Sequence, residues 1–243
     1  MTATTRFRAL PALALLAGLA ACGAGDAPSG GTVGRSAGGA AAPDLAPSGA
    51  PAMDAAVDPN APAPEAKTST IAVAGGTAEI SFKRFDAPAG FPLQFTTYVP
   101  EDMIVETLRA GKADGVRVVV NFGGKRNENA YLWALFHPPG TDEAKARETY
   151  QGVVARHGEP AELPERQRRF AWALAEHEFQ YQPTQGETRI GRLALGRRGD
   201  RFFHLVIEYP EDLAAEFVPR VNRILEDWRW KDGGRRIGDA RSR

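Results

Sequence analysis

The stretch Val116-Arg117-Val118-Val119-Val120-Asn121-Phe122, followed by Tyr131-Leu132-Trp133-Ala134-Leu135-Phe136, decides the fold that we predict for this chain. Both runs are nearly apolar and rich in β-branched and aromatic residues, which favours strands buried within a sheet. The loop Gly123–Asn129 joins them, as in a hairpin. We therefore place these two strands at the centre of a sheet and assign the rest of the chain around them.

Further strands are predicted before this pair. Ile71–Ala74 and Ala78–Phe85 flank a Gly-Gly dipeptide, which is a hairpin signal. Residues 91–99 alternate apolar and polar side chains, as a half-buried strand does. Met103–Arg109 could form a short helix, but its β-branched residues favour a strand that pairs with residues 116–122.

A helix and three more strand segments are predicted after the pair. Thr141 is expected to cap a helix over Asp142–His157, whose apolar residues recur at helical spacing. Residues 170–181 are ambiguous but end as a strand. Residues 189–195 and 202–209 are predicted to form a hairpin.

The last predicted helix occupies about Glu211–Trp230. Pro219 must lie at a break or in a new first turn, because proline lacks the N–H that a helix interior uses. Trp228 continues the apolar stripe and is expected in the core. Trp230 lies off that stripe, and it is either an exposed contact or a cover for a sheet edge.

This order of elements predicts an α+β fold, in which a single twisted antiparallel sheet carries two main helices. A strand with Tyr98 near Pro100, a hairpin, two hydrophobic strands, a helix, and a final strand and helix over Phe202–Trp230 resemble the PsbP/DcrB-type α/β sandwich. The resemblance covers roughly Phe91–Trp230 and implies that fold. It brings no functional residues with it, because a shared fold does not imply a shared function.

The N-terminus carries a targeting signal. Arg6 and Arg8 precede an apolar stretch over Ala9–Leu19, and Leu19-Ala20-Ala21-Cys22 follows. The last four residues resemble the lipobox of bacterial lipoproteins. That resemblance implies cleavage before Cys22, acylation of its sulfur, and a membrane anchor of two or three chains. An ordinary signal-peptidase site beside a free cysteine is the alternative.

The chain is expected to divide into four segments: a signal peptide over residues 1–21, Cys22 with a disordered tether to residue 68, a globular domain over residues 69–230, and a disordered basic tail over residues 231–243. The tether is dominated by Ala, Pro, Gly and Ser, so it cannot bury enough apolar area to fold. In bacterial lipoproteins an Asp after the cysteine often retains the protein in the inner membrane. The resemblance therefore implies, from Gly23, an outer-membrane protein with its domain in the periplasm, and inner-membrane anchoring is the alternative.

Composition excludes several classes of site. Thirty basic and thirty acidic residues give a net charge of zero, so no global field attracts nucleic acid. A lipidated Cys22 leaves no thiol, and no serine elbow occurs. None of the four histidines has a local metal-binding spacing, and His204 is expected on the polar face of its strand. We therefore predict no catalytic residue, metal or cofactor, although a site of scattered residues is not excluded.

Two short motifs favour turns over binding sites. Gly123-Gly124-Lys125-Arg126 lacks the Lys-Ser/Thr and the following helix of a phosphate-binding loop, so it indicates a hairpin. Arg198-Gly199-Asp200 between two strands is likewise typical of a tight turn rather than of an adhesion motif. Lys125, Arg126 and Trp230 remain candidates for contact with a partner.

These observations lead to two hypotheses about function. The favoured one is an envelope lipoprotein whose domain is not an enzyme and binds a partner, such as another envelope protein. The alternative is an envelope hydrolase or a protein that handles lipids or small ligands, with a site built from scattered residues. A deep apolar pocket with converging polar groups favours the alternative, whereas an exposed aromatic patch favours a partner.

Replacing Cys22→Ser removes the sulfur that the lipobox resemblance identifies as the acylation site. We expect the variant to carry no fatty-acid label and to remain soluble or uncleaved, as membrane fractionation of labelled cells will show. Unchanged labelling of the variant contradicts the lipoprotein interpretation.

Overall fold

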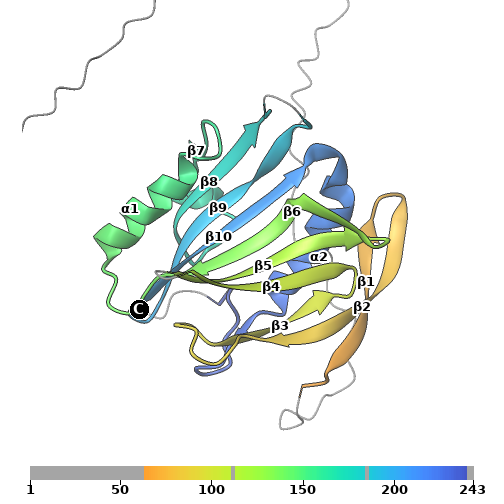
Figure 1. Cartoon of the computed structure of the whole chain (residues 1–243), viewed down its shortest axis with the longest axis horizontal. Coiled ribbons are helices and arrows are strands. Elements are labelled where there is room, and N and C mark those ends of the chain that lie inside the picture. The colour runs from red at the N-terminus through yellow and green to blue at the C-terminus, as the bar shows by residue number, and fades with distance from the viewer. Residues whose placement is uncertain (1–62, 111–112, 184–185, 240–243) are drawn as a thin grey trace, which may run out of the picture. The chain divides into compact units, whose positions relative to one another are not determined.

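The computed structural model describes residues 63–110, 113–183 and 186–239. The expected signal peptide, Cys22 and the tether up to residue 62 lie outside the described residues. Two antiparallel sheets and two main helices make up the described part of the chain (Figure 1). An α+β fold is therefore present.

The larger sheet has seven strands and contains the two runs that were placed at its centre. In spatial order, its strands are β4 (Met103–Ala110), β5 (Ala113–Phe122), β6 (Lys125–Phe136), β10 (Arg201–Pro210), β9 (Arg189–Arg198), β8 (Ala173–Tyr181) and β7 (Ala161–Glu162). Every neighbouring pair is antiparallel. The hairpins predicted from residues 103–122 and 189–209 are both confirmed.

The smaller sheet has four strands: β1 (Ala66–Val73), β2 (Gly76–Asp86), β3 (Phe95–Pro100) and β11 (Arg229–Trp230). The prediction of a single sheet is therefore wrong. Hydrophobic periodicity shows which face of a strand is buried but not which strand pairs with it. Here β3 pairs with β2 and β11, and the chain passes to the other sheet at Glu101-Asp102.

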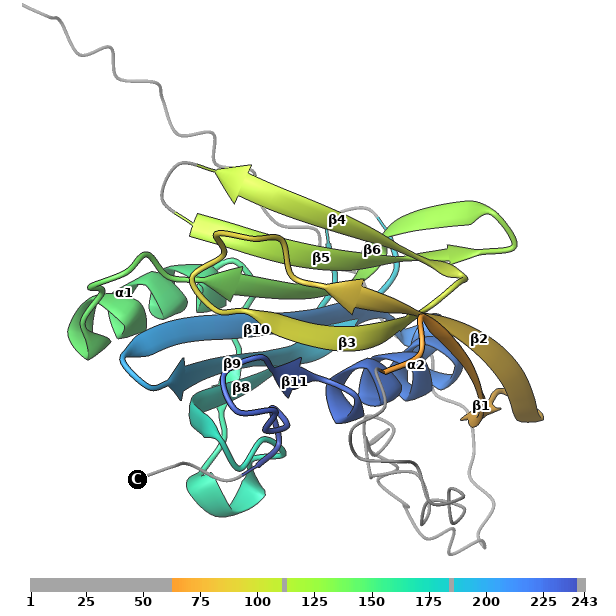
Figure 2. The ribbon, with the colours of Figure 1, turned by 90° about the horizontal axis from the view of Figure 1, so that it is seen from below.

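The two helices pack on opposite faces of the seven-stranded sheet. Helix α1 (Glu143–Val154) contributes to a cluster that contains Val206, whereas α2 (Ala214–Glu226) contributes to the cluster that contains Leu205. These two residues are neighbours in β10, so their side chains point to opposite faces. Figure 2 shows α2 next to the strands of the smaller sheet, whose residues belong to the same core cluster.

Both helices differ in detail from the sequence prediction. Asp142 rather than Thr141 caps α1, because its carboxylate accepts a hydrogen bond of 2.7 Å from the amide of Lys145. A short 3₁₀ helix over Glu211–Leu213 precedes α2, and another spans Glu165–Gln167. Pro219 lies inside α2 rather than at a break.

Aromatic rings in mutual contact fill the core between the two sheets. The ring of Phe95 lies 3.7 Å from that of Trp228 and 5.7 Å from that of Phe136. Trp228 is buried as predicted, but Trp230 is only 3% exposed and packs edge-on to Phe203 at 5.3 Å. Because β11 pairs with β3, the strand that contains Trp230 covers the edge of β3. Trp230 itself is buried, so it does not form an exposed contact.

The prediction of a disordered tail does not hold for residues 231–239. Ile237 is buried in the core, and its amide donates to the carbonyl of Trp228. The amide of Trp230 in turn donates to the carbonyl of Arg235. A single apolar side chain in a polar segment thus ties this end of the chain to the aromatic core.

Candidate functional site

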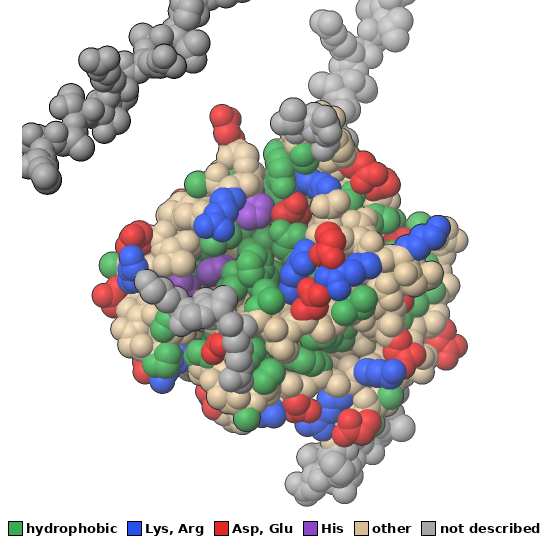
Figure 3. All heavy atoms as spheres, viewed as in Figure 1, with side chains coloured by type: hydrophobic (Ala, Val, Ile, Leu, Met, Phe, Trp, Pro, Cys, Tyr) green, Lys and Arg blue, Asp and Glu red, His purple; other side chains and the backbone are tan. Residues whose placement is uncertain are grey.

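A groove of about 520 Å³ lies between α1 and the outer face of strands β6 and β10. Leu135, His137 and His204 come from the sheet side, and Pro138 and Thr141 come from the loop that leads into α1. Figure 3 shows histidine side chains reaching the surface beside hydrophobic ones on the face that carries α1. The groove therefore combines apolar walls with a few polar groups, as ligand sites do.

Helix α1 presents two different stripes of side chains. Its buried residues Ala146, Tyr150 and Val154 pack toward the sheet. A second stripe of the helix lines the groove at helical spacing and consists of Lys145, Thr149, Gly152 and Val153, and Arg156 continues it just past the end of the helix. The first stripe holds the helix in place, which leaves the second free to form a wall of the groove.

Two histidines meet beneath this wall. His204 is 4% exposed, and its Nδ1 lies 3.3 Å from Nε2 of His137, so that one imidazole donates to the other. The Nε2 atom of His204 is buried and has no hydrogen-bond partner among the described residues. The expectation that His204 lies on a polar strand face is wrong, because the groove-side face of β10 is covered by α1.

Burial keeps this histidine pair uncharged at neutral pH. It lowers the pKa of His204 to about 3, with a smaller contribution from the neighbouring His137. The pKa of His137 is lowered for the same reason. The unpartnered nitrogen of His204 is therefore part of a neutral ring that offers a hydrogen bond without a charge.

A third histidine is held next to the pair by Tyr150. The Tyr150 hydroxyl donates to the carbonyl of Leu193 at 3.0 Å and lies 3.0 Å from Nδ1 of His177. Because the hydroxyl has one proton, His177 must donate from Nδ1. The ring of Tyr150 also lies 6.3 Å from that of His204. Burial lowers the pKa of His177 too.

A buried carboxylate fixes the far end of α1. Glu208 accepts hydrogen bonds from the hydroxyls of Tyr131 at 2.7 Å and Tyr181 at 2.9 Å, and His157 lies 3.4 Å away. Burial alone raises the pKa of Glu208, but its hydrogen bonds with these three partners outweigh burial and lower it. Nδ1 of His157 also lies 2.8 Å from the carbonyl of Val153, so this network ties the end of the helix to the sheet.

Gly152 is the least expected residue in the wall. It lies inside α1, where glycine costs up to about 1 kcal/mol relative to alanine. No atom lies within 4 Å of the position that a Cβ would occupy there, so packing does not require a glycine. Because Gly152 lines the groove and has no side chain, it leaves this part of the groove open.

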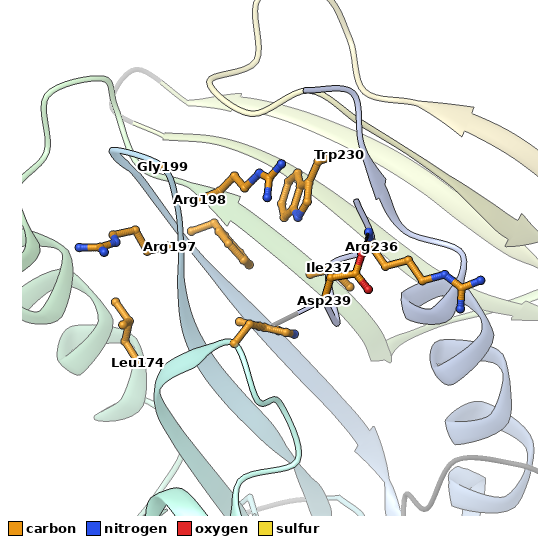
Figure 4. A pocket seen from close by; sticks show the side chains of 10 residues that line it. Leu174, Arg197, Arg198, Gly199, Trp230, Arg236, Ile237 and Asp239 are labelled. Carbon is orange, nitrogen blue, oxygen red and sulfur yellow. Dashed lines mark hydrogen bonds between the residues drawn. The ribbon is translucent and has the colours of Figure 1, made fainter. Parts of the chain in front are cut away.

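A second, smaller crevice of about 200 Å³ lies near the end of the described chain. Figure 4 shows Arg197, Arg198 and Trp230 among the side chains around it. Arg198 is held by Asp232, whose carboxylate lies 3.1 Å from its guanidinium. We regard this crevice as a packing gap beside the aromatic core rather than as the site.

The sequence-predicted contact residues do not form one surface. Gly123 and Gly124 adopt positive φ angles and make the tight turn between β5 and β6, as predicted. Arg126 is paired with Glu128 and with Glu106, the latter at 2.6 Å. Lys125 is exposed in that hairpin. Trp230, in contrast, lies in the core.

The predicted turn at Gly199-Asp200 is present between β9 and β10. Among the described residues, no three His, Cys, Asp or Glu side chains are grouped so that they could hold a metal ion. Nor does the described part of the chain include a helix that is long and apolar enough to cross a membrane.

Comparison of the chain with protein-family models, with curated proteins and with solved structures found no match. The resemblances to lipoproteins and to PsbP/DcrB-type domains therefore stay predictions. The argument for function depends on the geometry of the groove.

The buried neutral state of His204 makes stability depend on pH. Its pKa is lower in the folded protein than in the unfolded chain, where it is about 6.5, so the unfolded chain gains protons first as the pH falls. Stability is then lost below about pH 6.5, by up to about 2 kcal/mol from this group by pH 5. Denaturant unfolding of His204→Phe at pH 7 and pH 5 should show a smaller loss than the wild type. An equal loss in both proteins contradicts the assignment.

Proposed function

We propose that this chain is a lipid-anchored envelope protein whose folded domain binds a small, largely apolar ligand in the groove beside α1. The proposal favours binding of a small ligand over docking of a protein partner. The predicted tether boundary at residue 68 is too late, because β1 already begins at Ala66. Lipid on Cys22 and the shorter tether would keep the domain close to a membrane, with the outer membrane and the periplasm as the proposed location.

The observation that carries the proposal is the unpartnered Nε2 of His204. A buried polar atom without a hydrogen bond costs about 1–3 kcal/mol. Such a cost is rarely retained unless a water, an ion or a ligand supplies the missing partner. His204 is among the residues that line the groove, so a small rotation of its buried ring would present this nitrogen to a guest there.

A second orphan group lies on the same face of the sheet. Trp133 precedes the groove residue Leu135 by two positions in β6, and its indole Nε1 is also buried without a partner among the described residues. Side chains two apart in a strand point to the same face. Trp133 is not among the residues that line the groove, and other described side chains also have buried atoms without a hydrogen-bond partner, so the proposal depends on His204.

Partner docking has less support from the surface. Among the described residues with assigned exposure, Leu108 is the large hydrophobic residue that counts as exposed, at 37%. The aromatic contact proposed for Trp230 is buried. Apolar surface gathered in one place is what marks a protein-docking site, and a single leucine does not provide it. Half-exposed apolar side chains do gather on the face that carries α1, but Leu135 among them lines the groove and so belongs to the proposed ligand site.

The fold itself is consistent with the PsbP/DcrB-type sandwich that the sequence resembles. Support comes from the order of elements over residues 91–230 and from an antiparallel sheet with one helix on each face. We include this finer assignment in the proposal. It adds nothing to the choice of ligand.

Filling the groove tests the function. Full-length chain with Cys22→Ser, purified without detergent, is titrated with the neutral fluorescent probe N-phenyl-1-naphthylamine. We expect saturable binding, and we expect Gly152→Leu to weaken it at least tenfold because the new side chain enters the groove.

Gln151→Leu is the matched control, since it adds the same side chain to an exposed position of α1 that does not line the groove. It should bind the probe as the parent chain does. Equal affinity of the folded Gly152→Leu variant and its parent would falsify the proposal.

A further inference from the structure

The charged residues of the groove all have the same sign. Its lining includes Lys145 and Arg156 but no aspartate or glutamate. Eleven positions separate these two cations, and the helical part from Lys145 to Val154 alone rises about 14 Å at 1.5 Å per residue. The groove thus has a cation near each end of α1, with Lys145 in the first turn and Arg156 two residues past the last residue, Val154.

Neither Lys145 nor Arg156 forms an ion pair that would prevent it from binding a ligand. Lys145 pairs with Glu148 at 2.8 Å, but both side chains are more than half exposed, so the ion pair contributes little to stability. Lys145 can therefore leave Glu148 and bind an anionic ligand instead. Arg156 is exposed, and no ion pair joins it to another described residue. Both side chains are therefore available to an anion.

The histidines determine where a negative charge can lie. His137 and His204 provide hydrogen bonds but no positive charge, and both are buried. An anion placed among them would lose its hydration without gaining a counter-charge, which is costly. The charged group of a ligand must therefore lie at an end of the groove, and its uncharged part must lie against Leu135, Pro138 and Val153.

From this arrangement we propose that the ligand is an elongated anionic amphiphile, a single hydrocarbon chain that carries an acidic head group. The inference rests on the function proposed above and adds the ligand's class to it. The chain lies along α1, and the acid binds Lys145 or Arg156. The absence of acidic side chains from the lining disfavours a cationic amphiphile, and a neutral one leaves both cations unused.

Three probes of equal chain length test the class. Full-length chain with Cys22→Ser is titrated calorimetrically with laurate, dodecanol and dodecyltrimethylammonium, each below the concentration at which it self-associates. We expect laurate to bind at least tenfold more tightly than either of the other two probes. The double variant Lys145→Gln/Arg156→Gln should lose this preference while remaining folded.

Arg147→Gln is the matched control for charge. Arg147 is also on α1, but it pairs with Glu143 and does not line the groove, so its loss should leave the preference for laurate intact. Single variants of the two groove cations then show which end of the groove holds the acid.

Several results overturn the inference but leave the function standing: dodecanol binds as tightly as laurate, the double variant keeps the preference, or N-phenyl-1-naphthylamine binds while laurate does not. If neither laurate nor N-phenyl-1-naphthylamine binds the folded chain, the inference and the proposed function fail together.

Discussion

The antiparallel pairing of β6 with β10 is the constraint on which the rest of this structure depends. The register sets His204 opposite Leu135 and Glu208 opposite Tyr131, so residues about 70 positions apart in the sequence become neighbours. One end of the paired strands brings His204 to His137 and forms the floor of the groove. The other end brings Glu208 to Tyr131 and anchors α1. A slip of one residue would move all of these side chains to the opposite face of the sheet.

Helix α1 completes the site because only one of its sides packs against the sheet, and the other side lines the groove. Tyr150 and the Glu208 network hold it against β8, β9 and β10, where its apolar side chains pack. Its other side faces β6 across the groove, and Gly152 adds nothing to fill the gap. The fold therefore bears two small costs here, a glycine in a helix and a histidine nitrogen without a partner. Both costs have a simple explanation if a ligand occupies the gap.

Much of the fold could be predicted from the sequence because strands and turns depend on the residue pattern within each short segment. Alternating or continuous apolar runs identified the strands, and the dipeptides Gly123-Gly124 and Gly199-Asp200 identified two of the turns. The division into two sheets could not be predicted, since it depends on which strands pair. The site was missed for the same reason. No spacing joins His137, His177 and His204, and the burial of His204 follows from a helix whose position only the folded chain defines. Gly152 was the one local signal, a glycine within an otherwise regular helix.

The central claim is that a ligand binds against the paired imidazoles of His137 and His204. Nitrogen-15 NMR of the histidine rings, recorded while N-phenyl-1-naphthylamine is added, tests it most directly, because each ring nitrogen reports its own hydrogen bond and proton. The account predicts that the Nε2 signal of His204 shifts saturably with the probe and that the His137 ring follows. His157, held between Val153 and Glu208 outside the groove lining, should change little. Saturable probe binding that leaves the His204 signal unmoved would contradict the account.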